Sequence, residues 1–117
     1  MTTKEVAAMI ASIGLPYAYY QFPDNTGQEP PFLCFYYPQT QNFYADDEKY
    51  VGFETLIIEL YTDEKAFDLE AKVETALQAH GLAYERAEEY IKSERMLMEV
   101  YTIQLLLEKT LPDSGET

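Results

Sequence analysis

The segment of residues 50–82, YVGFETLIIELYTDEKAFDLEAKVETALQAHGL, constrains the fold more than any other part of the sequence, because a strand pattern passes directly into a helix pattern. Around residues 56–60 the enrichment in apolar and β-branched side chains is typical of a strand. The spacing then becomes that of an amphipathic helix, with Asp63 as the expected N-cap. The helix is expected to end where Gly81 adopts the left-handed conformation and Leu82 folds back on the last turn.

The remaining elements follow from local signals along the chain. Thr2 and Glu5 form a capping box that begins a first helix, which ends near Gly14. The other predicted strands are residues 17–22, 32–37, 83–92 and 95–108. This order predicts a single α+β domain over residues 1–110, with a mostly antiparallel sheet of four to five strands and two helices on one face. Residues 111–117 are expected to form a disordered tail.

One face of the predicted sheet is left without a cover. Leu56 and its alternate neighbours face the two helices, whereas Val51, Phe53, Ile57 and Tyr61 point to the other side. Because the chain has no further element to cover that side, a partner subunit is the economical explanation. A monomer with a somewhat apolar surface is the alternative.

A second candidate interface lies in the polar segment of residues 38–49. Phe43 and Tyr44 are the aromatic residues of this segment, and exposed aromatic side chains are common at interface hot spots. We therefore expect both side chains to contact a neighbouring subunit.

The charge balance argues against nucleic acid as a specific ligand. The 117 residues include 21 acidic and 8 basic side chains, which give a net charge of −13. The basic residues form no stripe that could neutralise phosphates, so specific binding to DNA or RNA is disfavoured. The acidity serves either solubility or a surface that must not adhere to nucleic acid. The sequence also lacks a secretion signal and an apolar run of membrane-spanning length, which indicates a cytosolic protein.

Residues with catalytic or metal-binding potential are few. His80 lies in the last turn of the second predicted helix, where it is expected to interact with the helix dipole. The run Asp46-Asp47-Glu48 lacks the glycine and ligand spacing of a calcium loop, so a solvated acidic loop is favoured over a cation site. Cys34 lies in an apolar run and is expected to be a small buried residue. We therefore predict a protein that is not an enzyme and that holds no cofactor or metal.

The order of elements, the proline-rich stretch before the second strand, the strand-to-helix segment of residues 50–82 and the acidic hairpin after it resemble a known family. They look like the small tail-terminator or tail-completion proteins of long-tailed bacteriophages and prophages, over residues 3–108. The resemblance implies a virion structural protein at the head-tail junction, made in the host cytoplasm. It implies a hexameric ring of identical subunits, with the tail tube protein and the head-connector protein as partners, and it carries over no catalytic residues.

Other classes stay open beside this family. A different head-to-tail connector or minor capsid protein would have a similar composition. A small acidic inhibitor that mimics DNA is the non-structural alternative, although a sheet with two apolar faces favours higher assembly.

If such a ring surrounds the path of the genome, its wall should repel phosphate so that DNA passes without binding. Two acidic groups are candidates for this lumen, one in the polar segment and one on the predicted hairpin. They are Asp46, Asp47 and Glu48 in the segment, and Glu85, Glu88, Glu89 and Glu94 on the hairpin. A role in solubility alone is the alternative for both groups.

Overall fold

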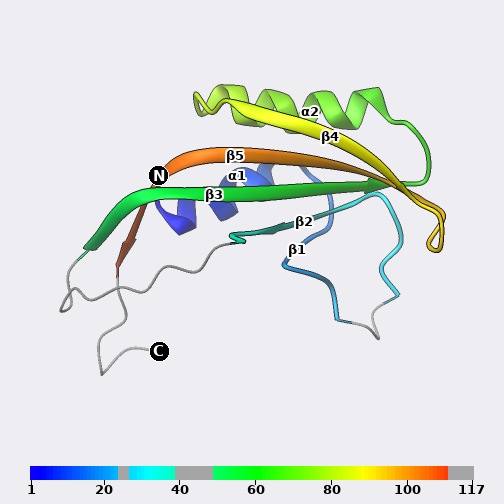
Figure 1. The fold of residues 1–117 in the computed structure, drawn as a ribbon, viewed down its shortest axis with the longest axis horizontal. Coiled ribbons are helices and arrows are strands. Elements are labelled where there is room, and N and C mark those ends of the chain that lie inside the picture. Colours follow the sequence, from blue (N-terminus) through cyan, green and yellow to red (C-terminus); the bar gives the residue numbers. More distant parts are fainter. Residues whose placement is uncertain (24–26, 39–48, 111–117) are drawn as a thin grey trace.

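The computed structural model describes residues 1–23, 27–38 and 49–110, which form an α+β fold (Figure 1). The elements in chain order are α1 (Thr3–Ser12), β1 (Tyr17–Tyr19), β2 (Phe32–Tyr36), β3 (Lys49–Thr62), α2 (Phe67–Ala79), β4 (Tyr84–Ile91) and β5 (Met96–Thr110). The predicted order of helix, three strands, helix and two strands is confirmed.

The five strands form one sheet in the order β1-β2-β3-β5-β4. β1 pairs with β2 in parallel, and the other three pairs are antiparallel, so the predicted mostly antiparallel sheet is confirmed. β3 and β5 form the longest strand pair of the sheet. They pair continuously from Lys49 opposite Thr110 to Thr62 opposite Leu97. β4 is the edge strand beside β5.

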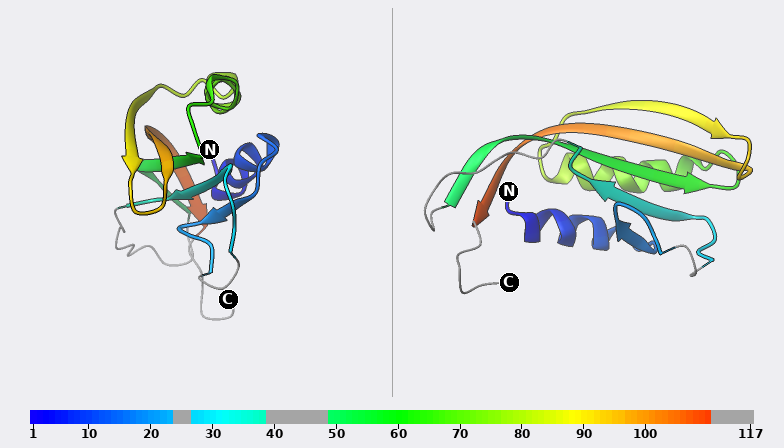
Figure 2. Two further views of the ribbon diagram at one scale, coloured as in Figure 1. Left: turned by 90° about the vertical axis from the view of Figure 1, so that its right-hand side faces the viewer. Right: turned by 60° about the horizontal axis from the view of Figure 1, so that its bottom comes forward.

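Both helices cover the same face of the sheet (Figure 2). α1 begins at the predicted capping box, in which Thr2 and Glu5 bond each other's backbone N–H. α2 ends as predicted, since the Leu82 N–H donates to the Leu77 carbonyl at 3.0 Å and Gly81 has a φ of 69°. The core between helices and sheet includes Val6, Met9, Ile10, Leu33, Leu56, Ile58, Leu60, Val73, Leu77, Tyr101, Ile103 and Leu107.

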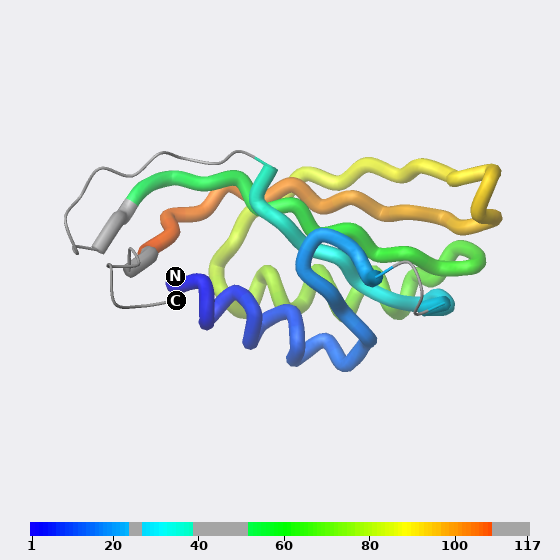
Figure 3. Tube along the Cα trace, turned by 90° about the horizontal axis from the view of Figure 1, so that it is seen from below, coloured from blue at the N-terminus to red at the C-terminus, as the bar shows by residue number. Residues whose placement is uncertain are grey.

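The opposite face of the sheet carries no helix within the described ranges (Figure 2). We call this the open face. The paired strands β3 and β5 extend beyond both helices at the end where β3 begins and β5 ends (Figures 1 and 3). We call residues 49–53 and 106–110 the arm. The β4–β5 turn lies at the other end of the molecule, so the open face runs from the arm to this turn.

The start of α2 differs from the prediction. The helix begins at Phe67 with Ala66 as its N-cap and has no side-chain cap, so the prediction of Asp63 as N-cap is wrong. The strand also does not pass directly into the helix, because residues 63–66 connect them. The physical reason is tertiary: this turn brings the ammonium group of Lys65 against carboxylates of α2 and β5.

The first strand is shorter than predicted. β1 ends at Tyr19, whereas the sequence pattern continued to residue 22. Tyr20 has a φ of 72°, in the left-handed region, and an extended strand cannot continue through that conformation.

Several predicted residues lie outside the part that the structure describes. These are Phe43, Tyr44, Asp46, Asp47 and Glu48, together with the predicted tail of residues 111–117. The backbone of Val51 belongs to β3 and pairs with Glu108, but its side chain is outside the description.

Candidate functional site

The open face of the sheet is the candidate site, because it presents apolar and aromatic side chains that the helices do not cover. Cross-strand partners share a face, and Ile57 and Tyr61 alternate with core residues of β3, so both point to the open face as predicted. Each is partly buried. Met98 lies opposite Tyr61, and Val100 lies opposite Glu59, which continues the face into β5.

Phe53 and Leu106 form the most exposed apolar part of this face. They are direct cross-strand partners at the base of the arm, and 76% of Phe53 and 50% of Leu106 is exposed. An exposed aromatic-aliphatic pair on the open side of a sheet is typical of a surface that another protein covers. The structure therefore places the predicted interface residue Phe53 where a partner can reach it.

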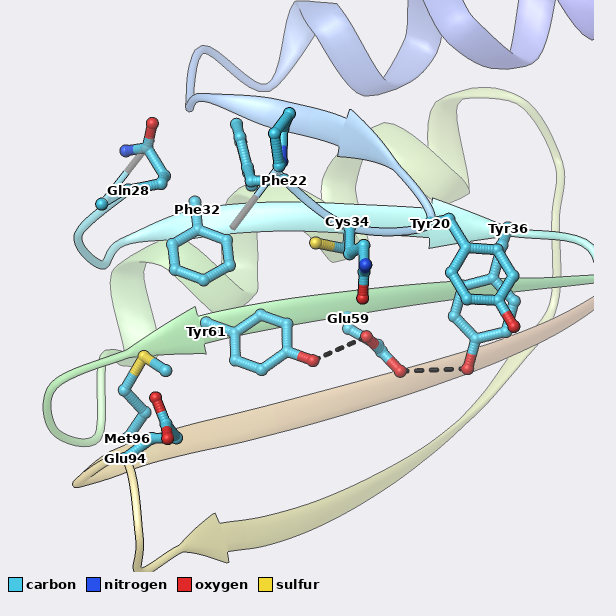
Figure 4. A pocket seen from close by; sticks show the side chains of 13 residues that line it. Tyr20, Phe22, Gln28, Phe32, Cys34, Tyr36, Glu59, Tyr61, Glu94 and Met96 are labelled. Carbon is cyan, nitrogen blue, oxygen red and sulfur yellow. Dashed lines mark hydrogen bonds between the residues drawn. The ribbon is translucent and has the colours of Figure 1, made fainter. Parts of the chain in front are cut away.

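The other end of the open face contains a hollow of about 470 Å³ (Figure 4). β2 and β3 supply its floor, and the chain that follows β1 supplies one side. Its aromatic and acidic lining includes Tyr20, Phe22, Phe32, Tyr36, Glu59 and Tyr61. Glu94, from the β4–β5 turn, also lines the hollow.

Glu59 lies at the centre of the hollow, between an aromatic pair on each side (Figure 4). The Tyr61 hydroxyl donates to Glu59 Oε1 at 2.7 Å, and the Tyr36 hydroxyl donates to Oε2 at 3.0 Å. Burial and the neighbouring Glu59 charge raise the pKa of Tyr36 to about 12 and raise the pKa of Tyr61 further. Both phenols therefore stay protonated at neutral pH and hold the carboxylate in one orientation.

A second polar cluster lies on the helix-covered side, between α2 and the β4–β5 hairpin. Lys65 Nζ is 2.7 Å from a carboxylate oxygen of Glu88, 2.9 Å from one of Glu70 and 3.2 Å from one of Glu99. Glu70 and Glu99 are buried, with 3% and 2% of their surface exposed. Burial of these carboxylates is tolerable because a cation is hydrogen-bonded to both.

Arg86 of β4 extends this cluster along α2. Its Nη1 is 2.8 Å from Glu74 and 3.1 Å from Glu70, and the hydroxyl of the buried Tyr101 donates to the same Glu74 oxygen at 3.0 Å. The cluster thus joins α2, β4 and β5. It also explains how a strand as rich in glutamate as β4 is stable at a sheet edge.

The spacing of three of these glutamates could hold a metal ion. Oxygens of Glu70, Glu88 and Glu99 lie within 4.8 Å of one another. The ammonium of Lys65 is already within hydrogen-bond distance of all three, however, and supplies the positive charge that a bound cation would bring. We interpret the cluster as an ion-pair network that holds the fold together.

The buried carboxyl of Glu99 predicts a pH-dependent stability. Burial and the hydrogen bond with Glu88 raise the pKa of Glu99 to about 7. The folded protein then keeps a proton that the unfolded chain releases, so stability from this group is full below the ordinary glutamate pKa and declines as the pH rises towards 7. Relative to Glu99→Gln, which cannot ionise, the wild type should lose about 3 kcal/mol of unfolding free energy between roughly pH 4 and pH 8.

Urea unfolding of both proteins across this range measures the difference. Glu85→Gln, at an exposed position of the same hairpin, is the matched control. Its unfolding free energy should change with pH in the same way as that of the wild type. A constant difference between wild type and Glu99→Gln at every pH would contradict the raised pKa.

The predicted acidic residues of the hairpin do not form one surface. Glu85 and Glu89 lie opposite Thr102 and Met98, so they project from β4 on the open face, and both are exposed. Glu88 projects to the other side and bonds Lys65. Glu94 lines the hollow.

Two single residues lie where the sequence predicted. His80 is at the end of α2, with Nδ1 3.0 Å from the Ala76 carbonyl oxygen. Cys34 is buried, with 3% exposed, and burial beside Glu59 raises the pKa of its thiol to about 11. The thiol therefore remains protonated at neutral pH.

Sequence reasoning missed Glu59 and the cluster of Lys65 and Arg86. One signal was present: Glu59 interrupts the apolar run of residues 56–60, and a charge at such a position needs a partner or a function. The partners come from segments distant in sequence, however, and only the fold brings them together.

A scan of protein-family models and a search of curated proteins gave no match to this chain. Within the described residues, no helix is long and apolar enough to cross a membrane.

Proposed function

We propose that this protein is a virion structural protein that assembles into a ring, caps the tail tube of a long-tailed bacteriophage and joins the tube to the head connector. The observation that carries the proposal is the exposed Phe53–Leu106 pair on a sheet face that no helix of the described chain covers. A second copy of the chain is the occupant of this surface.

The position of the pair allows a ring, which is the assembly that the family resemblance implies. It lies at the base of an arm that extends past the helices, and an extended arm reaches surfaces of a neighbour other than its own equivalent (Figure 3). Such a head-to-tail contact closes into a ring when the rotation between copies is right. The hexameric count comes from the family resemblance alone.

The exposed acidic residues of β4 fit the lumen of such a ring. Glu85 and Glu89 are free to face passing DNA, since both are exposed and neither bonds Lys65 or Arg86. Glu88 is a poorer candidate because its carboxylate is held by Lys65.

A different head-to-tail connector or minor capsid protein is the closest alternative, and the same surface would serve it. A DNA mimic is less well supported. Such a mimic needs free carboxylates, whereas Lys65 and Arg86 partly neutralise four glutamates of the hairpin and α2, namely Glu70, Glu74, Glu88 and Glu99.

The purified protein is expected to form rings at high concentration or on tail tubes. Sedimentation velocity over a wide concentration range gives the mass of the assembly, and negative-stain imaging gives its shape. Isolated tail tubes incubated with the protein should carry density at one end, which distinguishes a tail terminator from a connector that binds the portal. The proposal would be refuted if the protein stays monomeric at high concentration and also fails to bind tail tubes.

A further inference from the structure

The hollow on the open face combines a partly buried carboxylate with aromatic walls, a combination suited to a cation. We infer that this hollow binds an arginine side chain presented by a partner protein. Glu59 is the anion, and the rings of Tyr20, Tyr36, Phe32 and Tyr61 stand on either side of it (Figure 4).

The hydrogen bonding of Glu59 leaves room for such a ligand. A carboxylate has about four lone-pair sites, and the two tyrosine hydroxyls occupy one site on each oxygen. Across the described chain, neither oxygen forms an ion pair with a lysine or arginine, and no basic residue is among the described residues that line the hollow. Glu94 adds further negative charge to the lining. A guanidinium can therefore bond both oxygens at once.

The rings favour arginine over a compact ammonium group. The Phe32 and Tyr61 rings stack with a centroid distance of 4.8 Å and an interplanar angle of 20°. The Tyr20 and Tyr36 rings have a centroid distance of 5.1 Å and an interplanar angle of 33°. Two aromatic pairs beside one carboxylate match the planar guanidinium. This group can stack on aromatic rings while its N–H groups donate two hydrogen bonds to the carboxylate.

The backbone conformation of Tyr20, which lines one side of the hollow, is maintained at a cost in stability. Its φ of 72° is a left-handed conformation that bulky residues rarely adopt, and the Tyr20 N–H is fixed by a bond to the Phe35 carbonyl at 2.8 Å. Strain of this kind persists where the surrounding structure imposes it and clusters at binding sites. Here it places the Tyr20 ring against Tyr36 at the edge of the hollow.

We expect the arginine to come from another molecule, and a basic partner protein is the source that the charge of this chain favours. The chain has two arginines, of which Arg86 is held by glutamates of α2. Arg95 lies between Glu94 and Met96, which line the hollow themselves, and it is not among the described lining residues. With a net charge of −13, the protein also attracts a basic partner. The hollow lies at the Tyr61 end of β3 and Phe53 lies towards the other end, so this inference does not depend on ring formation.

Titration of the full-length protein with a short acetylated, amidated peptide that contains one arginine tests the inference. NMR of the tyrosine rings follows the binding, and a peptide with citrulline in place of arginine is the neutral isostere. We expect saturable shifts at Tyr20, Tyr36 and Tyr61 with the arginine peptide, and binding weaker by about tenfold or more with citrulline. Glu59→Gln should weaken binding of the arginine peptide by a similar factor. Glu85→Gln, on the same face but outside the hollow, should leave that binding unchanged.

Tyr20→Gly separates binding from folding. Glycine adopts a positive φ without strain, so the thermal midpoint should not fall, while loss of the ring should weaken arginine binding. Equal binding of arginine and citrulline peptides, or an unchanged affinity in Glu59→Gln, would overturn the inference. Tighter binding of a lysine or trimethyllysine peptide would overturn the choice of arginine. A gain in affinity for the peptide in Arg95→Gln would show that the chain's own arginine fills the hollow.

Discussion

Replacement of Lys65 with methionine is expected to lower the free energy of unfolding several times more than replacement of the exposed Lys72, because it leaves buried carboxylates without their main cation. Glu70 and Glu99 are almost completely buried, and Lys65 Nζ lies within 3.2 Å of a carboxylate oxygen of each. Methionine keeps the length and the apolar stem of lysine, so the loss measures the charge and its hydrogen bonds.

The expected loss is smaller than that for an ion pair in which both partners are buried. About a third of the Lys65 side chain is exposed, so water can partly replace its ammonium group. Arg86 also remains near both acids, with ion-pair distances of 3.1 Å to Glu70 and 3.6 Å to Glu99. Lys72→Met, on an exposed position of α2, is the matched control and should change the unfolding free energy by less than about 0.5 kcal/mol.

Urea unfolding near pH 8, above the pKa of about 7 of Glu99, measures both variants with this carboxyl group ionised in the wild type. The network also predicts non-additivity, since residues that share hydrogen bonds are coupled. Lys65→Met should lower the unfolding free energy less in a Glu99→Gln background than in the wild type. In that background, one of the two buried carboxylates that lose their cation is already absent. Equal losses for Lys65→Met and Lys72→Met would show that the cluster contributes little to stability.

The parts of the fold that the sequence predicted are those with local causes. The capping box of Thr2 and Glu5 and the Schellman stop at Gly81 are each formed by residues within a few positions of one another, and both are present. The continuous β3–β5 pairing follows from two long apolar segments with the same alternation. Local chemistry was sufficient for these elements.

The errors have non-local causes. Asp63 has the chemistry of an N-cap, but the Lys65 contacts with α2 and β5 determine the path of this turn, and the helix begins later. Tertiary contacts overrode local propensity here. β4 shows the converse, because a sequence with poor strand propensity is held as a strand by pairs between Arg86 or Glu88 and residues outside the strand.

The candidate site was predictable only in outline. Alternation along β3 was enough to place Phe53, Ile57 and Tyr61 on one face. The hollow was not predictable, because it needs the left-handed Tyr20 and the return of the chain over β2, and neither has a signature in the sequence. A tyrosine with a positive φ has no compositional signal comparable to that of glycine.

The arm provides the sharpest test of assembly. Replacement of both Phe53 and Leu106 with threonine should weaken self-association by about 100-fold or more, because two exposed apolar side chains at the centre of a contact can each contribute about 2 kcal/mol to binding. Threonine is chosen because it retains the β-branched shape that strands favour. The thermal midpoint of the monomer should change little, since both side chains are largely exposed in the single chain.

Sedimentation velocity of the double variant beside the wild type measures the change, and tail tubes test whether joining fails in parallel. Tyr90→Thr is the matched control, because Tyr90 is an aromatic residue of β4 with 55% exposed but lies on the opposite side of the sheet from Phe53. If Tyr90→Thr weakens assembly as much as the double variant, general surface hydrophobicity drives association. If the double variant assembles like the wild type, the arm is not the contact between copies, and the open face must be covered in another way.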